Sequence, residues 1–453
     1  MTHPLVEYYR CPDHLAVVET AEGLPAEPRY FRLGHGLAYG RHRPPDRAQA
    51  VDGPVEVSDG VVVQGDRLVT PFDLAEAVDN LRGERYPEAL TAIADLSRVS
   101  LKRLAYYGVR PILTVGVRKH LQRLHWRGWE QISFPRWPVD TSVEAVMRRV
   151  VGLALEHGAV GEFPFIWFWP DGASSCVMMT HDVEGAAGAD ACDRLMDADA
   201  AHGVPSSFQV VPEAPWSTRT RTRSLVGRMR ARGFEVNVHD LSHDGTLFRN
   251  RDRFLRHAAT INARGREFGS RGFRSGAMYR RQDWFSALDI SYDMSVPNVA
   301  HLEPQRGGCC TVMPYFNGHV LELPLTTSQD YTLFNVLGRH DTGLWQQQID
   351  AILREHGLLS FIAHPDYLLD ERAWGVYLQL LGMLQGLRDE HGAWMAAPAD
   401  VDRWWRERQE MSLVHEDGEW TVTGAGSERA RVAWARLDEG RVVYDVSPAR
   451  RAA

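Results

Sequence analysis

The stretch Gly233-Phe-Glu-Val-Asn-Val-His-Asp-Leu-Ser-His-Asp-Gly245 combines the pattern of a β-strand with that of a metal site. Val236 and Val238 alternate with polar neighbours, which predicts a half-buried strand. His239 and His243 follow at its end, four residues apart. In a helical turn, positions i and i+4 share one face with Cβ atoms about 5–6 Å apart, so both imidazoles can reach one ion. The stretch therefore predicts a strand that ends in a pair of metal ligands, with a helical turn as one way for both to reach the ion.

Predicted strands and helices alternate on both sides of this stretch. The other strands include residues 176–180, 206–211, 271–275 and 358–363. Such alternation is typical of α/β proteins with a parallel sheet, either open or closed into a barrel. Functional residues of these folds lie at the C-terminal ends of the strands. We therefore expect an α/β chain whose site is built from strand ends.

The pattern of elements divides the chain into three parts. Residues 1–170 are predicted to form an N-terminal α+β extension, which includes an amphipathic helix at residues 112–124. Residues 171–408 carry the strand–helix alternation. In residues 409–453, short apolar runs separated by Asp-Gly and Glu-Gly turns predict a small antiparallel β tail. Two uses of the extension stay open, namely covering the barrel mouth or forming a dimer interface.

Composition excludes several classes of partner. The 453 residues carry a formal net charge of −8 with no long block of like charge. Nucleic acid is therefore not expected as a partner, because phosphate binding needs a concentrated basic face. No apolar run reaches the roughly 18 residues of a membrane span, and the N-terminus lacks the pattern of a secretory leader. Together with five scattered cysteines, these features predict a cytoplasmic protein without a disulfide framework.

Two carboxylates follow the predicted strand at residues 176–180. Asp182 and Glu184 are two residues apart, so in an extended segment they point the same way. Converging carboxylates repel each other unless a cation or a positive side chain lies between them. Glu184 with His239 and His243 makes two imidazoles and one carboxylate, a set that suits zinc, iron or cobalt with positions left open for water.

Two more reactive side chains lie at strand ends. Arg274, near the end of strand 271–275, can pair with Asp182 and keep it ionised. His364 follows strand 358–363 and can serve as a general acid. Taken singly, an Asp at a strand end is more often a helix cap, and an Arg in a loop is more often solvated. A His before Pro is more often structural. Their occurrence together, in order and at successive strand ends, favours a catalytic site.

This joint pattern resembles the NodB-homology polysaccharide deacetylases, also called carbohydrate esterase family four. Thr180-His-Asp-Val-Glu-Gly185 resembles the first motif and His239-Asp-Leu-Ser-His243 the second. Arg274-Ser-Gly276 resembles the third, whose Arg orients the general base, and Leu359-Ser-Phe-Ile-Ala-His364 ends like the fifth. The resemblance covers residues 172–405 and implies a distorted (β/α)7 barrel of the NodB type.

The resemblance also implies a divalent metal with a hydrolytic site around it. The implied metal ligands are Glu184, His239 and His243. Zinc is the expected ion, with cobalt, iron, nickel and manganese as alternatives. Asp182 is implied as the general base, and His364 is implied as the general acid.

The chain departs from the family pattern in its third and fourth motifs. Gly276 stands where the third motif usually has proline, and the backbone N–H offered to the oxyanion falls at Ala277. The fourth motif, which supplies an aspartate that polarises the acid, is not recognisable. Asp330 and Asp293 are the two candidates for that role beside His364.

The function expected from these residues is hydrolysis of an N-acyl amide. The expected reaction is N-deacetylation of an N-acetylamino sugar in a cytoplasmic saccharide or small-molecule biosynthetic pathway. Its partner would be a small saccharide or an N-acylated small molecule. Two alternatives stay open: a metal-dependent C–N hydrolase acting on a non-sugar amide, and a non-catalytic sugar-binding protein. Self-association of the chain also stays open.

Overall fold

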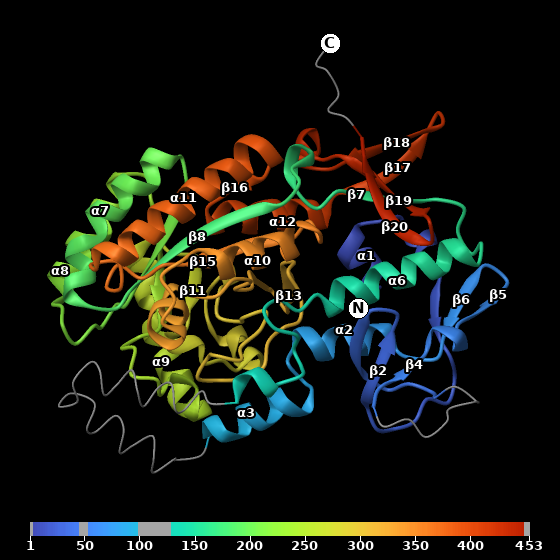
Figure 1. Ribbon diagram of the computed structural model, residues 1–453, viewed down its shortest axis with the longest axis horizontal. Helices are drawn as coiled ribbons and strands as arrows, with labels where there is room; N and C mark the ends of the chain where they lie inside the picture. The colour runs from blue at the N-terminus through green and yellow to red at the C-terminus, as the bar shows by residue number, and fades with distance from the viewer. Residues whose placement is uncertain (1–2, 45–52, 98–127, 448–453) are drawn as a thin grey trace. The chain divides into compact units, whose positions relative to one another are not determined.

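The computed structural model describes residues 3–44, 53–97 and 128–447 (Figure 1). The helix predicted over residues 112–124 lies outside the described residues. The chain forms two compact units, made of Met1–Tyr86, Thr141–Ser175 and Arg403–Ala453, and of Pro87–Asp140 and Cys176–Asp402. The three-part division at residues 170 and 408 stays a prediction.

The first unit contains short helices and several small sheets. Its helices are α1 (Pro4–Tyr9), α2 (Leu74–Arg82) and α6 (Ser142–Glu156). Its N-terminal strands are β1 (Val18–Thr20), β2 (Arg29–Leu33), β3 (Gly36–Gly40), β4 (Val55–Glu56), β5 (Val62–Gln64), β6 (Arg67–Thr70) and β7 (Phe163–Ile166). Its C-terminal strands are β17 (Ser412–Glu416), β18 (Glu419–Thr423), β19 (Val432–Asp438) and β20 (Arg441–Val446). The C-terminal strands pair antiparallel, and β19 also pairs with β7, so the tail extends a sheet that begins before the barrel.

The second unit is built on a curled sheet in which seven parallel strands follow in the order β14-β12-β11-β10-β9-β8-β15. The antiparallel β13 adds an edge beside β14, and β16 pairs with the start of β8. The bounds are β8 (Cys176–Val183), β9 (Ser206–Val210), β10 (Glu235–His239), β11 (Gly272–Arg274), β12 (Tyr292–Asp293), β13 (Tyr315–Asn317), β14 (Val320–Glu322), β15 (Leu358–Ile362) and β16 (Trp394–Met395). The predicted α/β class with a distorted barrel-like parallel sheet is confirmed.

Side chains join the two ends of this sheet. The chain beyond β14 runs beside β15, where Thr326 Oγ1 donates to Leu358 O at 2.6 Å and accepts from Ser360 N at 2.9 Å. Thr327 Oγ1 donates to Ser360 O at 2.7 Å. Hydroxyl groups thus take the place of backbone partners here, which satisfies groups that an open sheet edge would leave unpaired.

Helices cover the outer face of the sheet next to β8. All eight residues of β8 are buried, as expected for a parallel strand covered on both faces. The helices α7 (Ala186–His202) and α11 (Glu371–His391) lie side by side near this strand (Figure 1). α7 ends at Gly203 in the left-handed conformation, and Asp370 caps the start of α11. No helix within the described ranges is long and apolar enough to cross a membrane.

The described part of the second unit contains further helices. They are α3 (Pro87–Ser97), α8 (Arg219–Ala231), α9 (Arg251–Phe268), α10 (Gly343–Leu353) and α12 (Pro398–Glu410), the last of which continues into the first unit. Asn250 caps the start of α9, and Gly269 ends it with φ of 65°. These connections return the chain to the start of each strand, so the carboxyl ends of the strands gather at one end of the sheet.

Candidate functional site

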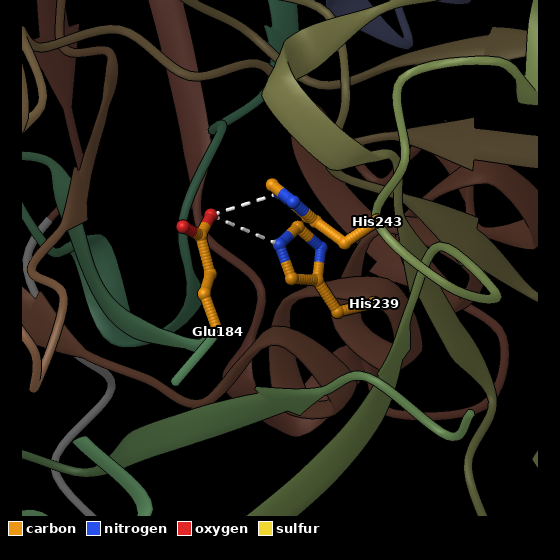
Figure 2. A group of neighbouring side chains, drawn as sticks. All are labelled: Glu184, His239 and His243. Atoms are coloured by element: carbon orange, nitrogen blue, oxygen red, sulfur yellow. Dashed lines mark ion pairs between the residues drawn. The ribbon is translucent and has the colours of Figure 1, made fainter. Parts of the chain in front are cut away.

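Glu184, His239 and His243 converge on one point at the carboxyl ends of the strands. Glu184 directly follows β8, and His239 is the last residue of β10. Figure 2 shows the carboxylate facing both imidazole rings, with Glu184 Oε1 2.9 Å from His243 Nε2 and 3.5 Å from His239 Nε2. The three ligand atoms all lie within 4.8 Å of one another. The structure therefore brings together the three residues that the sequence indicates as metal ligands.

The two histidines reach this point without the helical turn that the four-residue spacing allows. After His239 the chain forms an irregular loop in which Asp240 and His243 have positive φ angles of 55° and 54°. Asp240 stabilises the loop by accepting hydrogen bonds from Leu241 N at 2.6 Å and Gly276 N at 3.1 Å. Aspartate tolerates the left-handed region because its short side chain can bond locally. The ring centroids of the two histidines are 4.9 Å apart.

Gly276 is required by the close approach of this loop. A Cβ atom at this position would lie 2.5 Å from Asp240 Oδ2 and 2.8 Å from His243 Cδ2. Its N–H is also the donor to Asp240, which a proline could not supply. The departure from the third family motif thus has a local cause, because the residue must be small and must carry an N–H.

The donor set fits a divalent cation. His239 Nδ1 donates to Arg274 O at 3.1 Å, so the lone pair of Nε2 faces Glu184. Within the described ranges, the buried Nε2 atoms of His239 and His243 make no hydrogen bond of acceptable geometry. Burial acts to raise the pKa of Glu184, but His243 and His239 hold it well below its ordinary value. Two imidazole nitrogens and one ionised carboxylate are ligands that suit zinc.

Asp182 lies beside this cluster and is held by Arg274. Arg274 Nη1 donates to Asp182 Oδ1 at 2.8 Å and to Thr180 Oγ1 at 2.7 Å, and both charged side chains are buried. Burial acts to raise the pKa of Asp182, but Arg274, with the nearby histidines, lowers it overall. The second carboxylate oxygen, Oδ2, lies 3.8 Å from His239 Nε2. The arrangement keeps the carboxylate ionised and turns one oxygen toward the cluster.

His364 also lies beside the cluster and is bound by Asp330. Its Nδ1 lies 2.6 Å from Asp330 Oδ1, and its Nε2 lies 3.6 Å from Glu184 Oε1. Burial acts to lower the pKa of His364, but Asp330, Glu184 and Asp182 raise it to about 10. With Nδ1 bonded to a carboxylate, Nε2 is the ring nitrogen that faces the site.

Of the two candidates beside His364, the structure brings only Asp330 to it. Asp293 instead accepts hydrogen bonds from the N–H and the hydroxyl of Ser295, both at 2.8 Å. Ser295 in turn accepts from Ser275 N at 2.8 Å, which supports the loop after β11. Ala277 lies in this loop, half-buried, with φ of 54°. Its role as the oxyanion donor stays a prediction.

Three contributors to the site escaped the sequence analysis. Thr180 shares the Arg274 guanidinium with Asp182, and Met294 O accepts from Arg274 Nε at 3.0 Å. Tyr367 places its ring edge-to-face with His364, with centroids 5.0 Å apart. Thr180 belongs to the first motif and Tyr367 lies three residues after His364, so their nearness in the sequence was a signal. The role of the Met294 carbonyl could not be predicted, because every residue has a backbone carbonyl.

No known family model matches the chain, and no curated protein matches it. Among solved structures, the chain is similar to a putative polysaccharide deacetylase from Mycobacterium smegmatis, with 16% identity, a TM-score of 0.45, and coverage of 56% of this chain and 98% of that chain. It is also similar to Puue allantoinase, with 12% identity, a TM-score of 0.43, and coverage of 52% and 92%. A third is the peptidoglycan deacetylase PdaC from Bacillus subtilis, with 11% identity, a TM-score of 0.33, and coverage of 52% and 93%.

Proposed function

We propose that the chain is a metal-dependent amide hydrolase that removes the acetyl group from an N-acetylamino sugar. One arrangement carries the proposal: an ionised carboxylate and a carboxylate-bound histidine flank a three-ligand cluster. Asp182 Oδ2 and His364 Nε2 are 4.0 Å apart, and His364 Nε2 is 3.6 Å from the ligand atom Glu184 Oε1. A protein that only binds sugar needs neither a held base nor a held acid beside the ligands.

The metal site supplies electrophilic chemistry. A divalent ion held by Glu184, His239 and His243 would polarise the acyl oxygen and lower the pKa of a coordinated water toward about 7. The ligands come from two different strand ends, so their spacing depends on the rigid sheet rather than on one flexible loop.

Asp182 is the group that takes a proton from the attacking water. Its Oδ1 is occupied by Arg274, so Oδ2 is the oxygen available for this transfer. Arg274 also keeps the carboxylate ionised, since the guanidinium offsets the cost of burying that charge. As the C–O bond forms, charge develops on the acyl oxygen, and the N–H of Ala277 is the backbone donor proposed to stabilise it.

His364 protonates the leaving nitrogen. An amine is too basic to depart as an anion, so the C–N bond breaks only as nitrogen gains a proton. The bond to Asp330 orients the ring, and the charge of Asp330 favours the protonated form by raising the pKa of His364. Asp182 gains one proton and His364 loses one in each turnover, and exchange with water restores both.

The test combines metal analysis with a panel of substrates. Purified protein is offered free and nucleotide-linked N-acetylamino sugars beside non-sugar N-acetyl amines and primary amides, and released acetate and ammonia are measured. We expect one zinc per chain, acetate release from the sugars, and loss of activity with a chelator that added zinc reverses. The double variant His239→Ala, His243→Ala is the control and should hold no stoichiometric ion.

Three outcomes contradict parts of the proposal. Equal metal content in the wild type and the double variant places the ion elsewhere. Acetate or ammonia from the non-sugar amides alone changes the substrate class. Tight sugar binding with neither product indicates a binding protein.

A further inference from the structure

A second buried histidine–carboxylate pair lies behind the candidate site. His181 stands between Thr180 and Asp182 on β8, and because side chains alternate along a strand, its ring points to the opposite face from Asp182. There its Nε2 lies 2.9 Å from Asp199 Oδ2 on α7. Both side chains have 0% exposure to solvent. The proposed mechanism uses neither residue.

Two further groups hold the Asp199 carboxylate in place. Ser206 Oγ, at the start of β9, donates to Asp199 Oδ2 at 2.6 Å. The hydroxyl of Tyr377 on α11 donates to Asp199 Oδ1. Burial, together with the charge of Asp199, raises the pKa of Tyr377 well above its ordinary value, so this phenol stays a donor. One residue of β9 and one of α11 therefore fix this carboxylate, and the carboxylate fixes the ring of His181.

The other ring nitrogen of His181 reaches the backbone beside the proposed acid. Nδ1 donates to Ala363 O at 2.9 Å, because a carbonyl oxygen can only accept. This oxygen belongs to the peptide that joins Ala363 to His364. The N–H of the same peptide donates to Asp330 Oδ2 at 2.7 Å. The peptide unit in front of His364 is thus held from both sides.

We propose that His181, supported by Asp199, is a positioning residue for the acid His364. The proposal rests on the proposed function, because it concerns the same site. His181 links β8, which carries the base, to the end of β15, which precedes the acid. A hydrogen bond to the carbonyl also polarises the peptide and strengthens its N–H as a donor to Asp330. The result is one chain of hydrogen bonds from Asp199 to the ring of His364.

A role in packing alone makes a different prediction, which a pair of variants can separate. The ring of His181 packs on Phe208, with centroids 4.8 Å apart. His181→Phe keeps an aromatic ring but removes both hydrogen bonds, whereas Phe208→Leu loosens the same contact and leaves them intact. For His181→Phe we expect kcat to fall about 10- to 100-fold, with KM within about 2-fold and metal content unchanged. Phe208→Leu should lose thermal stability while the folded protein keeps its kcat.

His181→Gln tests the hydrogen bond directly, since an amide N–H can still donate to Ala363 O. We expect it to recover part of the kcat lost in His181→Phe. Should His181→Phe fail to fold, the kcat of His181→Gln is compared with that of Phe208→Leu instead. A lower kcat for His181→Gln supports the positioning role, and equal values contradict it. Equal kcat in the folded wild type, His181→Phe and His181→Gln overturns the proposal.

A measurement made without substrate separates this proposal from the proposed function. In the zinc-loaded protein with 15N-labelled histidines, the Nδ1–H of His364 should exchange slowly with solvent. His181→Phe should speed that exchange, and Phe208→Leu should not. If the wild type hydrolyses no amide yet the exchange follows this pattern, the reaction is wrong and the positioning role stands. Unchanged exchange in His181→Phe overturns the positioning role, whatever the activity.

Discussion

Asp330 accepts two hydrogen bonds from His364, one from the ring Nδ1 at 2.6 Å and one from the backbone N–H at 2.7 Å. Each carboxylate oxygen takes one of them, so the ring and the backbone of His364 are held by a single side chain. The ring cannot turn without losing a charge-assisted hydrogen bond inside a buried site. Nε2 is consequently kept facing Asp182 and Glu184.

Asp330→Asn should impair the acid without removing it. The neutral amide supports a protonated imidazole less well, so we expect kcat to fall about 100-fold with little change in KM. Steady-state kinetics on the best substrate measures this effect. Asp293→Asn is the matched control, because Asp293 contacts Ser295 instead of His364, and it should alter stability more than kcat. A larger kcat loss in the control would favour Asp293 as the orienting residue.

Asp182→Asn and Glu184→Gln should separate the base from the metal ligand. Asp182→Asn removes the proton acceptor but leaves the ligands, so we expect retained zinc and at least about a 1000-fold loss of acetate release. Glu184→Gln should lower zinc content as well as activity, because a neutral amide is a poor ligand for zinc. Metal analysis and acetate release are measured on the same samples. Undiminished acetate release by Asp182→Asn would rule out the base.

Gly276→Ala should weaken metal binding through the position of His243. The added Cβ would lie 2.5 Å from Asp240 Oδ2 and 2.8 Å from His243 Cδ2, so the loop must shift. We expect zinc affinity to fall about 10- to 100-fold in a competition titration with a chelator. Gly375→Ala in α11 is the control: a Cβ there meets nothing within 4 Å, and the change should stabilise the helix by about 0.5–1 kcal/mol. Equal zinc affinity in the two variants would mean that the loop tolerates the shift.

Glu303 should make stability depend on pH. Burial raises its pKa from 4.5 to about 7, against the opposing hydrogen bond from Gln329. The folded pKa is the higher one, so the contribution of Glu303 is complete below about pH 4.5 and is lost as the pH rises through about 7. Glu303→Gln cannot ionise and does not lose this contribution. Between pH 4.5 and 8, the difference in free energy of unfolding between the variant and the wild type should therefore shift in favour of the variant by on the order of 3 kcal/mol. Denaturant unfolding at several pH values measures this difference, and parallel profiles would contradict the raised pKa.

The strand ends were predictable because their signal is local. β8 begins with the apolar run Cys176–Met179, and the polar residues that follow mark the approach to its end. In a parallel sheet those stops meet at one end, so Glu184 and His239 could be expected to lie together from chain order alone. The loop after His239 could not be predicted in this way. The loop is held by Asp240, which accepts the N–H of Gly276 from the loop after β11.

The sequence by itself indicated the α/β class with a parallel sheet and the side chains that meet at the candidate site, because periodicity and residue type act over a few neighbours. Tertiary structure alone decided between Asp330 and Asp293 beside His364, because both lie far from it along the chain. It also decided that a peptide carbonyl joins His181 to the acid. Hydrogen bonds require directed approach within about 3 Å, and only the folded sheet brings such distant groups that close.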